Sequence, residues 1–307
     1  MLARLQQLIT LGLAAAAGGW LVSFWPTSPV LGLAGFVVIA LGYSLFLAIE
    51  FIFLKSLHGA DPTPTPSWAN VIHAWAGETL TTPRVFCWRQ PFRVNAIPDS
   101  VPGPGAPDAP PRRGVVFIHG FVCNRGLWTP WMQRLQTQGR PFVAVNLEPV
   151  FGGIDNYVPI VDAAVRRLTD ATGLAPVLVC HSMGGLAARA WLREGGRGEG
   201  DARVHRIITI GTPHGGTWLG RFSHVTNGRQ MQLDSDWLRT LAAGEPPARA
   251  ARFTCWHSNC DNIVFPASTA TLPGADNRFV PGVAHMALAF CPQVMEATLA
   301  EIDADTP

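Results

Sequence analysis

The chain has 307 residues, of which 48% are hydrophobic and 14% are charged, and its formal net charge is +2 at pH 7. This near-neutral balance, with no basic cluster interleaved with aromatic residues, argues against a nucleic-acid partner. The six cysteines form no paired C-x-x-C set, so neither a zinc site nor any other metal or cofactor is predicted. We expect free, mostly buried thiols, since a bond between Cys255 and Cys260 would conflict with the reducing compartment inferred below.

The first part of the chain predicts a transmembrane hairpin within residues 1–57. No charged side chain occurs between Arg4 and Glu50. This stretch is too long for one crossing, because about 20 helical residues span the ~30 Å hydrocarbon core. We therefore predict helices at Leu5 to Phe24 and Val30 to Leu54, joined by a Trp-Pro turn. Glycines and alanines in both segments would let the two helices pack closely.

Charges at the two ends of the hairpin predict its orientation. Arg4 and Lys55 flank it, and the turn carries no charge. The positive-inside rule then places both ends, and the catalytic domain, on the cytoplasmic side of the inner membrane. The alternative interpretation is a signal peptide cleaved near the Ala14 to Ala17 run.

Residues 58–113 are expected to connect the hairpin to the rest of the chain. A Pro-Thr linker, an amphipathic helix at Ser67 to Thr79, a strand pair at Val85 to Val94 and an exposed loop at Pro98 to Arg113 are predicted in turn. The helix lies either at the bilayer surface or against the catalytic domain, and both alternatives remain open.

Residues 114–307 predict an α/β fold with a mostly parallel sheet and helices on both faces, because short apolar strands alternate with amphipathic helices. The expected strands are Val115 to Ile118, Phe142 to Asn146, Val177 to His181, Val204 to Ile210 and Ala251 to Trp256; the expected helices are Trp128 to Gln138, Val158 to Thr172, Leu186 to Arg193 and Pro292 to Ile302. Trp218 to Leu241 is the segment with room for a lid, and its apolar side chains are either the lid underside or core.

A candidate nucleophile lies where one of these strands meets a helix. The run from Val177 to Gly185 places Ser182 at a strand-to-helix turn, which exposes and aims its hydroxyl. Cys180 stands where the usual G-x-S-x-G pattern has its first glycine, and it is small enough to be tolerated there. Upstream, a His-Gly turn follows the strand that ends at Ile118. We expect the backbone N–H groups of Phe121 and Met183 to form an oxyanion hole.

A serine nucleophile requires a base and an acid that orients the base, in the chain order Ser, Asp, His. Asp261 follows a strand end and His285 comes later, so these two residues are the predicted acid and base. His214 is the rival for the base and Asp276 the rival for the acid. His119 and His181, inside the two motifs, are expected to point away from the chemistry.

Together, these motifs resemble the lipase and esterase branch of the α/β-hydrolases, particularly bacterial lipases with an H-S-M-G-G elbow and a T-P-H-x-G-T segment, here Thr212 to Thr217. The resemblance implies an α/β-hydrolase fold and hydrolysis of carboxylic esters through an acyl-enzyme, with acyl lipids or other apolar esters as substrates. An acyltransferase that uses the same triad is the alternative. A non-catalytic membrane scaffold is disfavoured, because all three triad positions hold competent residues.

Overall fold

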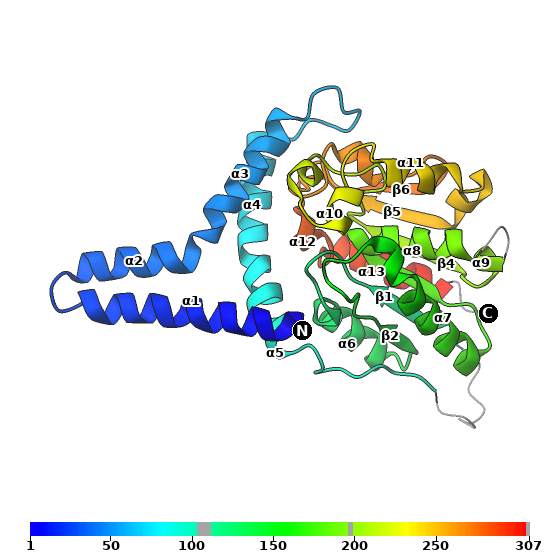
Figure 1. The fold of residues 1–307 in the computed structure, drawn as a ribbon, viewed down its shortest axis with the longest axis horizontal. Coiled ribbons are helices and arrows are strands. Elements are labelled where there is room, and N and C mark those ends of the chain that lie inside the picture. Colours follow the sequence, from blue (N-terminus) through cyan, green and yellow to red (C-terminus); the bar gives the residue numbers. More distant parts are fainter. Residues whose placement is uncertain (103–111, 196–198, 305–307) are drawn as a thin grey trace.

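An arm of two helices projects from an α/β body in the computed structural model, which describes residues 1–102, 112–195 and 199–304 (Figure 1). The arm consists of α1 (Leu2–Phe24) and α2 (Pro29–Leu41). Ser28 caps α2 by accepting the N–H of Leu31, and Pro29 occupies the first turn, where its missing N–H costs nothing.

The second predicted helix is broken in two, so the prediction of a single helix from Val30 to Leu54 was wrong. After α2 the chain bends by 51° into α3 (Tyr43–Ser56). A side chain at Gly42 would come within 2.6 Å of the Val38 carbonyl oxygen, so glycine makes the bend possible. By length and composition, α1 is apolar enough to cross a membrane, and the bent pair of α2 and α3 is a second span only if the two count as one.

The predicted strand pair at Val85 to Val94 was also wrong. Helix α4 (Trp68–Pro83) continues directly into a π-helical segment, η1 (Arg84–Arg89), and then into α5 (Gln90–Phe92). The apolar run has strand-like composition, but tertiary packing overrides it, because Val85 is fully buried in the core of the α/β body. Part of the predicted loop, residues 103–111, lies outside the described residues.

The sheet confirms the predicted fold class. All neighbouring strands are parallel, in the order β2-β1-β3-β4-β5-β6. The strands are β1 (Val115–Ile118), β2 (Phe142–Ala144), β3 (Val177–His181), β4 (Arg206–Ile210), β5 (Phe253–His257) and β6 (Asp276–Phe279). Strand β6 was not predicted. The order reverses at β1, so the carboxyl ends of β1 and β3 form the crevice where open α/β sheets bind ligands.

Helices cover both faces of the sheet. One core cluster unites α7 (Val158–Thr172) and α8 (Met183–Glu194) with one set of alternating strand residues, and the other unites α6 (Thr129–Thr137) and α13 (Pro292–Ala304) with the opposite set. The remaining elements are short: η2 (Arg125–Trp128), η3 (Ile154–Tyr157), α9 (Glu199–Ala202), η4 (Trp218–Phe222), α10 (Thr226–Gln230), α11 (Asp236–Ala243), η5 (Pro247–Arg252), η6 (Ala267–Ala270) and α12 (His285–Leu288). The six cysteines are free.

Candidate active site

The turn between β3 and α8 holds Ser182 in a strained conformation. Its φ is +55° and its ψ is −129°, a backbone geometry that non-glycine residues rarely adopt. The Ser182 N–H donates to the carbonyl of Ile210, and its carbonyl accepts from Thr212 Oγ1 at 2.8 Å. These bonds to β4 and the loop after it hold the strained turn in place.

Two glycines let other backbone segments approach this turn. A Cβ on Gly184 would lie 2.3 Å from the carbonyl oxygen of Ile118, so only glycine lets α8 pass so close to β1. A Cβ on Gly120 would lie 2.7 Å from the Cβ of Ser182. The turn after β1 therefore packs directly against the candidate nucleophile. Cys180, at the first position of the elbow pattern, is fully buried in the core beneath it.

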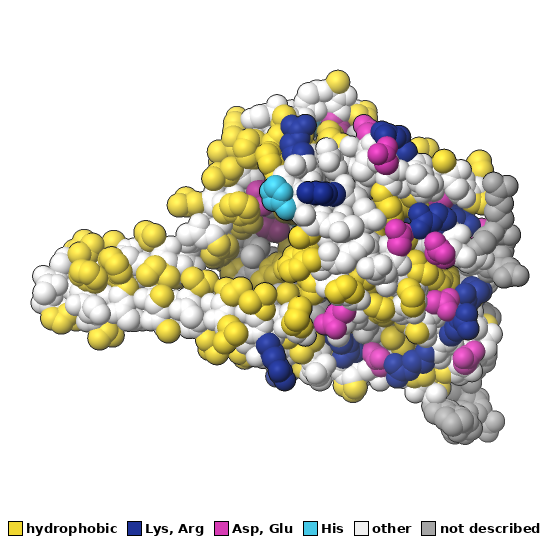
Figure 2. Space-filling model, in the orientation of Figure 1, with side chains coloured by type: hydrophobic (Ala, Val, Ile, Leu, Met, Phe, Trp, Pro, Cys, Tyr) yellow, Lys and Arg dark blue, Asp and Glu magenta, His cyan; other side chains and the backbone are white. Residues whose placement is uncertain are grey.

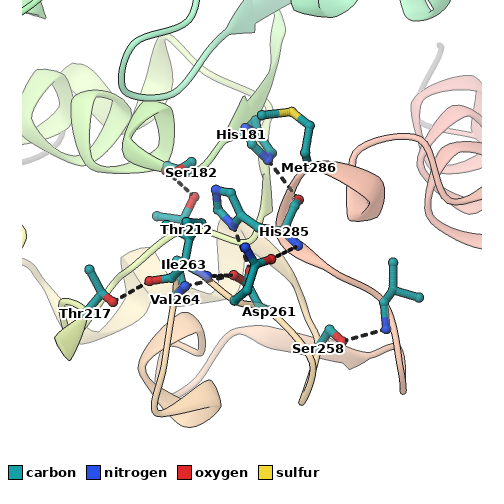
Figure 3. A network of polar contacts seen from close by, with 12 residues as sticks. His181, Ser182, Thr212, Thr217, Ser258, Asp261, Ile263, Val264, His285 and Met286 are labelled. Carbon is teal, nitrogen blue, oxygen red and sulfur yellow. Dashed lines mark hydrogen bonds and ion pairs between the residues drawn. The ribbon is translucent and has the colours of Figure 1, made fainter. Parts of the chain in front are cut away.

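The structure brings the predicted acid and base into contact. Nδ1 of His285 and Oδ2 of Asp261 are 2.9 Å apart, and both side chains are buried. The other carboxylate oxygen, Oδ1, accepts the N–H groups of Ile263 and Val264. Because the carboxylate can only accept, Nδ1 is the protonated nitrogen and Nε2 is left to act as a base. Figure 3 shows the ring of His285 between the Asp261 carboxylate and Ser182.

Charges around His285 favour its protonated form. Burial alone lowers the pKa of the imidazole, but the charge and hydrogen bond of Asp261 outweigh burial, so the net change is upward. Glu78 and Glu50 act in the same direction. Among the described residues, the hydroxyl of Ser182 makes no hydrogen bond. In structures without substrate, the hydrogen bond between a nucleophile and its base is often long, and it tightens when substrate binds.

The two rivals lie elsewhere. Nε2 of His214 contacts Thr209 Oγ1 at 3.0 Å, and burial lowers the pKa of His214 well below its usual value. Asp276 lies in β6 with an exposed side chain that pairs with Arg278. Neither residue lines the cavity beside Ser182.

The two motif histidines behave differently from each other. His119 is buried and bridges two loops, because its Nε2 accepts the N–H of Leu147 and its Nδ1 contacts the carbonyl of Gly120. Burial lowers the pKa of His119 to about 4. His181, however, lines the cavity and its ring centroid lies 4.7 Å from that of His285. The expectation that His181 points away from the site was therefore wrong.

The predicted oxyanion donors lie beside the nucleophile. Met183 is the first residue of α8, so its N–H points out of the helix N-terminus. Phe121 follows Gly120 in the turn after β1 and lines the same cavity as Ser182. Among the described residues, neither N–H donates to a protein acceptor. Both groups are therefore available to a ligand.

A cavity of about 350 Å³ lies beside Ser182. Ser182, His285 and Phe121 line one side, and the N-terminal helices close the other. The segment at 218–241 contributes nothing to the lining; Met231 and Leu238 are buried in the core instead. The helices that cover the cavity are therefore α3 and α4, which precede the sheet in the chain.

Sequence reasoning missed three residues that surround His285. Glu78 of α4 accepts the N–H groups of Met286 and Ala287, and Glu50 of α3 accepts from Asn262 Nδ2. The Oδ1 atom of Asn262 in turn accepts the His285 N–H at 3.2 Å.

Two signals in the sequence point to these acids. Glu50 is the first charge after the long apolar stretch, and ionisable residues at such places are often functional. Glu78 lies four residues after Ala74, on the buried stripe of α4. Among the residues that the structure describes, no group of three or more His, Cys, Asp or Glu side chains is arranged to hold a metal ion.

Comparisons with known proteins agree with this architecture. The structure is similar to the mature form of lipase BlEst2 from Bacillus licheniformis, with a TM-score of 0.56 and 16% identity over 65% of this chain and 96% of that one. It is also similar to lipase B from Aspergillus fumigatus, with a TM-score of 0.58 and 14% identity over 95% of this chain and 86% of that one. No curated protein matches the sequence. Residues 115–302, more than half of the chain, match the alpha/beta hydrolase family, and the protein belongs to that family.

Proposed function

We propose that the protein is a membrane-anchored serine hydrolase that cleaves carboxylic esters with an apolar acyl group. The observation that carries this proposal is that His285, paired with the buried Asp261, lines the same cavity as the strained Ser182. The proposed anchor consists of α1 and the bent pair of α2 and α3, with both ends on the cytoplasmic side.

The proposed reaction has two halves. Ser182 Oγ attacks the ester carbonyl carbon while its proton passes to His285 Nε2, and the N–H groups of Phe121 and Met183 stabilise the resulting oxyanion. The bond to the alcohol then breaks, and the alcohol leaves with the proton from His285. Water attacks the acyl-enzyme, gives a proton to His285, and releases the carboxylic acid as that proton returns to Ser182. Asp261 holds the imidazole tautomer throughout.

Covalent labelling tests this proposal. A fluorophosphonate probe applied to membranes that contain the protein should label Ser182, and the Ser182→Ala variant should lose both the label and the hydrolysis of p-nitrophenyl butyrate. A folded wild-type protein that takes no label, or a Ser182→Ala variant with full activity, would refute the mechanism.

A further inference from the structure

One wall of the cavity beside Ser182 belongs to a helix of the N-terminal region. Tyr43, Phe46 and Leu47 of α3 line it, opposite Ser182 and His285. These residues are among the first five of α3, directly after the 51° bend at Gly42. The bend therefore places a face of α3 across the active site.

Helix α3 is held firmly in this position. Phe51 is only 2% exposed and belongs to a cluster that joins α3, α4 and two loops of the α/β body: Phe51, Val71, Ala74, Cys260 and Ala284. Tyr43 donates its hydroxyl to the carbonyl of Thr79, and Trp75 Nε1 donates to the carbonyl of Ser44 at 2.8 Å. The wall is therefore part of the packed structure.

The same helix also faces outward with an apolar surface. Phe46 lines the cavity although its side chain is 65% exposed, so it lies at the mouth. Its neighbours Leu45, Ile49 and Ile52 are at least half exposed. Figure 2 shows apolar side chains along the arm and around the hollow where the arm meets the α/β body. The mouth thus opens onto the apolar surface that the proposed anchor presents to the bilayer.

The chemistry of the lining selects the kind of ligand. Among the described residues, no Lys or Arg lines the cavity, so no permanently charged cation there would pair with an anionic head group. Its two carboxylates, Glu50 and Glu78, are already occupied by Asn262 and by backbone N–H groups. The volume of about 350 Å³ lies within the usual range of small-ligand sites. A neutral hydrocarbon chain suits this space.

We propose that α3 forms an acyl-chain subsite and that the ester reaches Ser182 laterally, with its acyl chain passing from the bilayer along Phe46 and Leu47. This inference rests on the proposed ester hydrolysis at Ser182. It makes the anchor a part of the substrate-binding site.

A pair of matched variants of the full-length protein in proteoliposomes tests the subsite. Leu47→Trp fills the cavity, whereas Leu45→Trp makes the same change two residues earlier, on an exposed position that does not line it. We expect Leu47→Trp to lower the ratio of kcat/KM for p-nitrophenyl palmitate to that for p-nitrophenyl butyrate at least tenfold, and Leu45→Trp to leave the ratio unchanged. An unchanged ratio in a Leu47→Trp variant that melts like the wild type would overturn the subsite.

A second measurement on the wild type needs no substitution. A p-nitrophenyl phosphonate with a long alkyl chain and a terminal diazirine should transfer its phosphonyl group to Ser182 Oγ with loss of p-nitrophenolate. Photolysis should then crosslink the chain end to the peptide that contains Phe46 and Leu47. A crosslink in residues 218–241 would overturn the subsite while leaving ester hydrolysis intact. Absence of any Ser182 adduct would instead refute the proposed function itself.

Discussion

Replacement of Glu78 by glutamine should change how the stability of the protein depends on pH. The Glu78 side chain is buried against the first turn of α12 and accepts two backbone N–H groups there, each at 3.0 Å. Burial raises its pKa from 4.5 to about 7, against the opposing effect of these hydrogen bonds and of His285. Burial therefore disfavours the ionised form of the Glu78 carboxyl group.

The sign and size of the effect follow from this pKa. In the unfolded chain Glu78 ionises near 4.5, and in the folded protein near 7. Its contribution to stability is therefore fully present below pH 4.5 and is lost as the pH rises through 7. The difference between the two pKa values corresponds to about 3 kcal/mol. Glutamine cannot ionise, so the Glu78→Gln variant should lack this loss.

Thermal unfolding in detergent between pH 4.5 and 8 measures the effect. The unfolding free energy of the wild type relative to Glu78→Gln should fall by about 3 kcal/mol over this range, which is roughly 5 to 10 °C in Tm for a protein of this size. Glu296→Gln, on the exposed side of α13, is the matched control and should follow the wild type. Parallel curves for the wild type and Glu78→Gln would refute the reasoning.

Three further substitutions probe the site and its framework. Asp261→Asn should lower kcat for ester hydrolysis roughly 10³- to 10⁴-fold and shift the acid limb of the kcat/KM profile to lower pH, because the carboxylate raises the pKa of His285; an unchanged profile would contradict this role. Gly120→Ala should slow fluorophosphonate labelling of Ser182 at least tenfold, because the new methyl group would lie 2.7 Å from the Ser182 Cβ; equal labelling rates would show that the turn yields. Gly184→Ala should lower the unfolding free energy by roughly 1–3 kcal/mol, since its Cβ would meet backbone oxygen at 2.3 Å; an unchanged melting curve would count against this packing.

The sequence predicted the sheet and the position of Ser182 well, because both depend on local patterns. Buried strands and amphipathic helices alternate with clear periods, and the run into Ser182 carries its own turn chemistry. The assignment of Asp261 over Asp276 came from the place of Asp261 just past a strand end, and from the nearness of Asp276 to His285 in a Pro-Gly-rich loop. The structure places Asp261 against His285 and Asp276 in an exposed strand. The catalytic roles of these residues stay predictions.

The parts that sequence reasoning missed depend on contacts between distant segments. Val85, within the helical run over 84–92, and Phe51 of α3 both pack against the α/β body, and local propensity carries no information about such distant contacts. Glu50 and Glu78 meet partners more than 200 residues away. No spacing rule within one segment could have paired them with the loop of His285.

The hydrogen bond between Glu50 and Asn262 has a practical consequence for work with this enzyme. Deleting the first sixty residues to obtain a shorter fragment would remove the acceptor of the Asn262 amide. It would also remove Phe51, which packs against Cys260 and Ala284. Such a fragment would keep Ser182, Asp261 and His285 in its sequence and yet lack these contacts beside the loop of His285. A preparation of the intact chain, in contrast, keeps the bond between Glu50 and Asn262 and the packing of Phe51.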